Sequence, residues 1–101
     1  MWRLARCNVT DETKRQIDAA AEVLKRAGAT AVYVFGSAAE GTDTADSDLD
    51  LAVSGLPPAG FFHAVGEATM AVARPIDVID LDEPSAFTDY LERKGRLLRV
   101  A

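Results

Sequence analysis

Two apolar runs, each flanked by residues that can bind phosphate or metal, constrain the fold of this chain more than any other feature of its sequence. The first run, residues 31–35, is strand-like and stops at Gly36 and Ser37. The second run starts with Asp48 and Asp50, and ten residues separate it from Ser37. Because side chains alternate along a strand, the two carboxylates share one face, about 6.6 Å apart along the backbone. The pattern predicts two neighbouring strand ends that carry polar groups.

These four residues have the properties that nucleotidyl transfer requires. Asp48 and Asp50 can converge on two divalent cations that lie roughly 3.5–4 Å apart. Gly36 lets the backbone pass close to a ligand, and Ser37 offers a hydroxyl and an N–H at a helix start, where phosphate oxygens bind. Taken singly, Gly-Ser is typical of a turn and Asp-x-Asp of a solvated loop. Their combination on two strand-like runs favours a phosphate and metal site.

Caps and apolar periodicity predict the elements of the first half. Thr10 is expected to cap a helix over 11–27, whose apolar residues recur at helical spacing. A short helix is expected at 37–40. A strand over 49–54 follows after a short link, so we expect it to pair antiparallel with the strand at 31–35.

The second half is expected to form a further helix and strand. Gly-Leu-Pro-Pro breaks the preceding strand, and proline suits the first turn of the helix predicted over 59–72. His63 is expected on the solvent side of this helix. A strand is predicted over 76–81. The apolar face of the helix is expected to comprise Phe61, Phe62, Val65, Ala68 or Thr69, and Val72.

This strand–helix–strand unit implies a right-handed crossover and therefore a parallel strand pair. The crossover places Asp77 at the same end of the sheet as Asp48 and Asp50. Asp80 lies three residues later on the strand, so it points to the other face and is the weaker candidate.

The chain ends in a helix predicted over 84–94 and an extended tail that closes the core. No repeat or linker interrupts the sequence, and 101 residues suffice for one modest core. The expected fold class is therefore α/β (α+β): a single domain over residues 1–101, with a three-stranded mixed sheet flanked by about four helices.

Composition excludes several classes of function. A net charge of −5 argues against direct nucleic-acid binding, which depends on clustered Lys and Arg. No apolar run reaches the ~18–20 residues of a membrane span. The N-terminus lacks the pattern of a secretion signal, and the lone Cys7 suits a reducing compartment. We expect a cytoplasmic protein.

The motif also carries a family resemblance. Gly36-Ser37, ten intervening residues, Asp48-x-Asp50 and then Asp77 on a later strand resemble the minimal nucleotidyltransferase (MNT) domain of the DNA polymerase beta superfamily. Such domains occur as MntA-like antitoxins of MNT/HEPN toxin–antitoxin pairs. The resemblance extends over nearly the whole chain and implies a polymerase beta-like nucleotidyltransferase fold.

The resemblance implies a Mg²⁺-dependent enzyme that moves AMP from ATP onto a tyrosine hydroxyl of a HEPN toxin. Asp48, Asp50 and Asp77 would be the catalytic and metal-binding residues, with two Mg²⁺ ions or Mn²⁺ in their place. Gly36 and Ser37 would bind the nucleotide. Two alternatives stay open: an antitoxin with a vestigial site that neutralises its toxin by binding, and a small-molecule nucleotidyltransferase that works as a dimer.

One departure from the family pattern bears on this choice. Many relatives carry basic residues after Gly-Ser, where this chain has Ala38, Ala39 and Glu40. Weak nucleotide binding is therefore expected without a partner. The missing charge would come from the partner or from a cationic cluster near the C-terminus, formed by Arg93, Lys94, Arg96 and Arg99.

Overall fold

The computed structural model describes residues 11–36, 48–72, 74–83, 85–94 and 97–101. Ser37, the expected helix at 37–40 and the Thr10 cap lie outside these residues. Helices and strands follow one another in the order α1 (Asp11–Arg26), β1 (Ala31–Val34), β2 (Leu49–Ser54), the 3-10 turn η1 (Pro58–Gly60), α3 (Phe61–Val72), β3 (Ile76–Asp80), α4 (Ala86–Lys94) and β4 (Leu98–Arg99).

The four strands form one mixed sheet in the order β3-β2-β1-β4. The antiparallel pairing of β1 with β2 and the parallel pairing of β2 with β3 confirm the expected topology. The expected count of three strands is wrong, because the C-terminal tail pairs with the open edge of β1. Its Val100 N–H donates to the Val32 carbonyl at 2.8 Å, which satisfies a backbone group that would otherwise face solvent.

Helix α1 ends one residue earlier than expected, in a compact C-terminal cap. The Ala29 N–H donates to the Leu24 carbonyl and the Gly28 N–H to the Lys25 carbonyl, both at 3.1 Å. Gly28 adopts a φ of 122°, which a residue with a Cβ rarely accepts. This pattern is a Schellman motif, and it turns the chain directly into β1.

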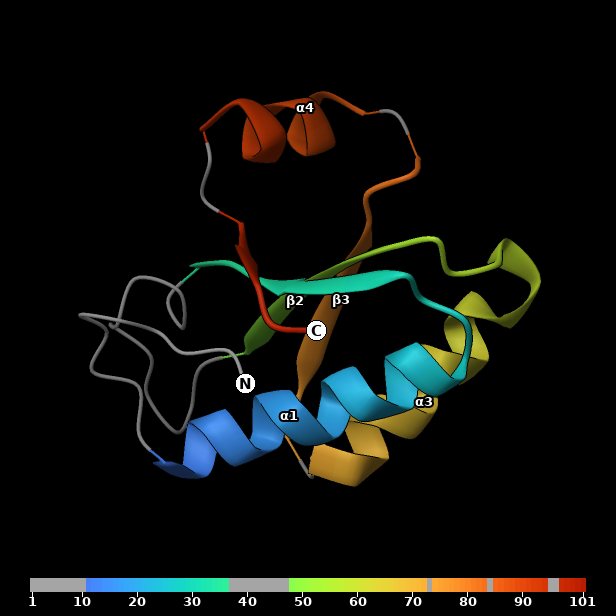
Figure 1. The fold of residues 1–101 in the computed structure, drawn as a ribbon, viewed down its shortest axis with the longest axis vertical. Coiled ribbons are helices and arrows are strands. Elements are labelled where there is room, and N and C mark those ends of the chain that lie inside the picture. Colours follow the sequence, from blue (N-terminus) through green and yellow to red (C-terminus); the bar gives the residue numbers. More distant parts are fainter. Residues whose placement is uncertain (1–10, 37–47, 73, 84, 95–96) are drawn as a thin grey trace.

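Helices cover the sheet on both faces. Figure 1 shows α1 and α3 together on one side of the sheet and α4 on the other. The main core lies on the α1 and α3 side and includes Leu49, Leu51 and Val53, all fully buried. A second apolar cluster, around Phe35 and Ala52, occupies the opposite face. Both faces of β2 are therefore anchored. In the part of the chain that is described, no helix could span a membrane.

The buried face of α3 agrees with the expected one at Ala68 and Val72, and Phe61 packs against the same core, but the expectation for Phe62 is wrong. Ala64, Ala68 and Val72 are buried, whereas Phe61 is half-buried and the side chain of Phe62 is 85% exposed. Two series of apolar residues recur at helical spacing on this helix. The series with two alanines faces the core because small side chains let α3 approach its neighbours closely.

Arg74 ties the start of β3 to α1. Its side chain is buried, and Nη1 donates to the Gln16 Oε1 at 2.9 Å and approaches the Thr13 Oγ1 at 3.5 Å. Its neighbour Pro75 accepts a hydrogen bond from the Leu49 N–H at 3.0 Å. Together these contacts hold the beginnings of β2 and β3 side by side.

Helix α4 begins two residues later than expected. Ser85 caps it, since its Oγ accepts a hydrogen bond from the Thr88 N–H at 3.0 Å. Pro84 precedes this cap and lies outside the described residues. A serine oxygen satisfies a free N–H of the first turn, which a proline ring cannot do.

Candidate functional site

Asp50 and Asp77 are direct neighbours across the sheet. The parallel register of β2 and β3 pairs Asp50 with Asp77, on strands that lie about 4.8 Å apart. Paired residues of parallel strands project to the same face, which here also carries Ala52 and Ile79. Asp50 is half-buried and Asp77 is exposed. Two carboxylates therefore lie side by side at the end of the sheet where β2 and β3 begin.

Gly36 lies against the Asp50 carboxylate. The Phe35 N–H donates to the Asp50 carbonyl at 3.1 Å, which continues the pairing of β1 and β2 up to the glycine. Gly36 has a φ of 69°, and a Cβ at this position would collide with the side chain of Asp50. Only glycine therefore allows the backbone after β1 to pass this close to the carboxylate.

Asp48 and Ser37 complete the predicted set only in part. Asp48 is exposed, immediately before β2, and alternation directs it to the same face as Asp50. Ser37 lies outside the described residues. Across the described segments, no three His, Cys, Asp or Glu side chains gather closely enough to hold a metal by themselves.

The carboxylates nevertheless suit one class of ion. Mg²⁺ prefers oxygen ligands and is usually bound by one or two carboxylates together with substrate phosphates and water. Asp50 and Asp77 supply such a pair, with Asp48 two residues before Asp50. The donor set therefore fits Mg²⁺ that arrives with a nucleotide, and it does not resemble a closed protein cage.

Asp80 lies away from this group. It pairs with Val53 near the other end of β3, and Val53 is buried on the α1 and α3 side of the sheet. One Asp80 carboxylate oxygen accepts a hydrogen bond from the Asp82 N–H at 3.0 Å, which shapes the turn after the strand. Asp80 thus has a local structural role.

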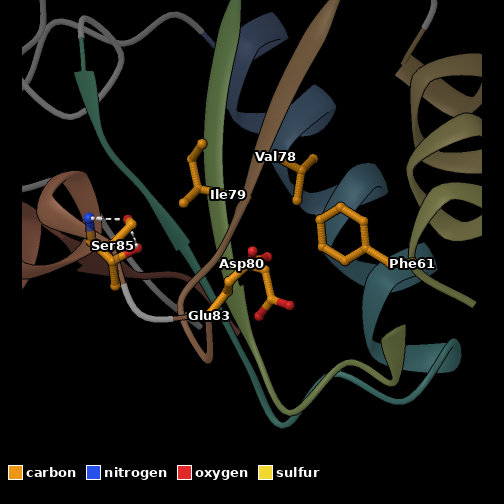
Figure 2. A pocket seen from close by; sticks show the side chains of 7 residues that line it. Phe61, Val78, Ile79, Asp80, Glu83 and Ser85 are labelled. Carbon is orange, nitrogen blue, oxygen red and sulfur yellow. Dashed lines mark hydrogen bonds between the residues drawn. The ribbon is translucent and has the colours of Figure 1, made fainter. Parts of the chain in front are cut away.

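A cavity of about 260 Å³ opens beside Asp80, at the opposite end of β3 from Asp77. Figure 2 shows Val78 and Ile79 on opposite sides of the strand, so the cavity wraps around this edge of the sheet. Two of its lining residues are acidic, which disfavours a phosphate group. The cavity is lined by Phe61, Val78, Ile79, Asp80, Glu83, Ser85 and Thr88.

The described cations of the C-terminal cluster do not reach the carboxylates. Arg99 lies opposite Tyr33, and its guanidinium donates to the carbonyls of Ala101 at 3.0 Å and Thr30 at 3.4 Å. Thr30 precedes β1, so Arg99 is bound at the end of β1 far from Gly36. Arg93 donates to the Asp89 carbonyl of its own helix. Lys94 and Arg96 carry no described side chain.

Arg74 is the supporting residue that sequence reasoning missed. It anchors the approach to β3 through its hydrogen bond to Gln16 on α1, three residues before Asp77. The sequence carries no clear signal for this role, because an arginine beside a proline can equally keep its guanidinium in water.

Comparisons with known proteins identify a matching family model and similar folds. The family model described as "Polymerase beta, Nucleotidyltransferase" matches residues 17–99. No curated protein matches the sequence. One similar solved structure is a minimal nucleotidyltransferase, with 22% identity and a TM-score of 0.67 over 88% of this chain and 91% of the other.

Two further neighbours are toxin–antitoxin structures. One was solved with AMP-PNP and has 21% identity and a TM-score of 0.65. Its alignment covers 89% of this chain and 72% of the other. The other is an MntA–HepT structure with 16% identity and a TM-score of 0.61, over 85% and 69% of the two chains. At these identities the neighbours establish the shared fold.

Proposed function

The chain belongs to the polymerase beta nucleotidyltransferase family, and from this membership we propose that it transfers AMP from ATP to a hydroxyl of a protein partner. We take residues 1–101 as one catalytic domain that acts in the cytoplasm. Support for a protein acceptor comes from the fold neighbours, two of which are toxin–antitoxin structures, one of them solved with the ATP analogue AMP-PNP. The proposed partner is a HEPN-type toxin, and the proposed acceptor is a tyrosine.

The pairing of Asp50 with Asp77 beside Gly36 is the observation that carries this proposal. Nucleotidyl transfer needs negative oxygen ligands for divalent cations and a backbone that approaches phosphate closely. The residues that would meet both requirements lie at the same end of the sheet, where β2 and β3 begin.

The reaction forms a bond between the acceptor oxygen and the α-phosphorus, and it breaks the bond from that phosphorus to the bridging oxygen of pyrophosphate. Asp48 and Asp50 would hold Mg²⁺ and, through it, the triphosphate, and Asp77 would serve the acceptor side. Bound Mg²⁺ supplies neutralisation of the charge that develops on the attacking and leaving oxygens. Asp77 is exposed, and in this proposal it would accept the hydroxyl proton.

Gly36 and Ser37 are proposed to orient the phosphates. Glycine lets the backbone approach a ligand closely, and N–H groups at the start of a helix favour anions. Catalysis would then depend mainly on positioning and charge, as is general for phosphoryl chemistry.

A second function, neutralisation by binding alone, is favoured by one observation. Ala38 and Glu40 replace the basic residues that many relatives present to the triphosphate. A protein that binds ATP poorly can still cover a toxin. The two functions differ in whether the carboxylates are needed for neutralisation.

Intact mass spectrometry of the partner tests the proposal. The chain is co-produced with the protein of the adjacent reading frame, and the purified complex is incubated with ATP and MgCl₂. The partner is expected to gain the mass of whole adenylyl groups, on a tyrosine. Asp50→Asn should abolish the gain, and Asp80→Asn, a matched control on the other face, should retain it. A growth assay of cells that produce the toxin distinguishes the second function. If wild type and Asp50→Asn restore growth equally, and the partner gains no mass, the protein neutralises by binding instead.

A further inference from the structure

Helix α3 carries an apolar stripe on its solvent side, composed of Phe62, Gly66 and Met70. The side chains of Phe62 and Met70 are 85% and 84% exposed, and Gly66 is also exposed. The spacing of four residues aligns the three positions along one side of the helix. The opposite side of α3 is the one buried in the core.

Phe62 is held in place although it faces solvent. Its ring meets the ring of half-buried Phe61 edge to face, with centroids 5.6 Å apart and an interplanar angle of 88°. Such aromatic pairs are attractive beyond their buried area. The exposed ring is therefore oriented in advance for a contact.

Among the described residues, none packs closely enough against Gly66 to require a glycine there. Glycine in the middle of a helix is destabilising relative to alanine. A Cβ built at residue 66 meets no atom within 4 Å, so the described neighbours leave room for any small side chain. A glycine at such a place permits the backbone of a second molecule to come close.

The stripe is symmetric about this glycine, with one large apolar residue four positions before it and one four positions after it. We propose that two copies of the chain pair through antiparallel α3 helices, with the twofold axis at Gly66. Phe62 of each copy then meets Met70 of the other. An isologous interface requires such self-complementarity, and sulfur–aromatic contacts are favourable.

The charge distribution makes α3 the part of the surface where a second copy meets the least repulsion. The chain carries a net charge of −5, so two copies repel each other over most of their surface. Helix α3 contains a single carboxylate, Glu67, and His63 Nε2 lies 2.8 Å from its Oε1. Two copies therefore meet with little repulsion along this helix.

The buried area sets the expected strength. Large side chains of this kind cover about 150–250 Å² each, so Phe62 and Met70 from both copies remove roughly 600 Å² from water. The smallest standard interfaces bury about 1,200 Å², and the flanking Ala59, His63 and Glu67 can supply much of the rest. We expect a weak dimer that dissociates at micromolar concentrations.

Sedimentation velocity over a concentration series tests this surface. Wild type should shift from monomer to dimer as the concentration rises to hundreds of micromolar. Phe62→Glu and Met70→Glu should each raise the dissociation constant at least tenfold, because each buries a charge in the apolar contact between Phe62 and Met70. Ala71→Glu, exposed on the same helix but outside the stripe, is the matched control and should dimerise like wild type.

A cysteine placed at the axis gives an independent test. In a Cys7→Ser background, Gly66→Cys should form an intermolecular disulfide under mild oxidation, since the Cα atoms of a disulfide lie about 4.4–6.8 Å apart. Ala71→Cys should cross-link much more slowly. A wild-type protein that stays monomeric at every concentration would overturn the proposal, even if a different protein binds α3, and so would equal cross-linking at both positions.

Discussion

Gly36 and Asp50 approach each other so closely that the glycine has no room for a Cβ. The contact joins the end of β1 to the start of β2, and it brings the backbone at Gly36 against the side chain of Asp50. The same contact links the fold to the proposed chemistry, because phosphate and metal would have to meet there.

Gly36→Ala should therefore cost both stability and function. A positive φ of 69° and the collision with Asp50 should together destabilise the protein by about 1–3 kcal/mol. Urea denaturation measures this loss. Gly60→Ala is the matched control, because a Cβ at residue 60 meets nothing within 4 Å, and it should change stability little. An unaltered midpoint for Gly36→Ala would refute the close contact.

Substitutions of Asp77 and Asp80 should have different effects on transfer activity. Asp77 pairs with Asp50, whereas Asp80 pairs with Val53 on the other face. Asp77→Ala should abolish transfer while retaining much of the nucleotide binding, since Asp48 and Asp50 remain. Asp80→Ala should leave both largely intact. If transfer depends on Asp80 instead, the proposed site is at the wrong end of β3.

Neutralising Asp77 should also stabilise the fold. Like charges on paired strand positions are destabilising, so Asp77→Asn should raise the free energy of unfolding by about 0.2–1 kcal/mol at low salt. The gain should shrink as salt screens the repulsion. Thermal unfolding at two ionic strengths measures it. A stabilisation that is independent of salt would point to a cause other than charge.

Ala38→Arg tests the departure from the family pattern. Residue 38 lies outside the described part of the chain, but it follows Ser37 directly, where the family resemblance leads us to expect a positive charge. The substitution should tighten ATP binding by about 1–2 kcal/mol, the scale of a charge-assisted hydrogen bond. The gain should be smaller when the partner is bound. Calorimetric titration of ATP into both proteins, with and without the partner, measures this gain. If wild type without the partner already binds ATP tightly, and Ala38→Arg does not change the affinity, the expectation is contradicted.

The main topology and the end of the sheet that carries the carboxylates could be predicted from the sequence. Period-two alternation and the crossover rule are general, and they place Asp77 at the same end as Asp48 and Asp50, whereas the direct pairing of Asp77 with Asp50 depends on the register and comes from the structure. The bounds of β2 agree with the prediction, and those of β1 and β3 differ by one residue.

Features that depend on tertiary competition could not be predicted in this way. Strand β4 has two residues, Leu98 and Arg99, and forms because β1 offers an open edge. Periodicity alone could not decide whether Phe62 or Ala64 of α3 faces the hydrophobic core, since both belong to apolar series with helical spacing. Arg74 likewise acquires its role only once α1 lies beside it.

Two parallel reactions with ATP, radiolabelled on the α-phosphate in one and on the γ-phosphate in the other, test the central claim most directly. Each contains the purified complex and MgCl₂, with Asp50→Asn as the control. Nucleotidyl transfer predicts label on the partner from the α-phosphate, none from the γ-phosphate, and none with Asp50→Asn. Label from the γ-phosphate, or α-label that persists with Asp50→Asn, would contradict a nucleotidyltransferase site at Asp50 and Asp77.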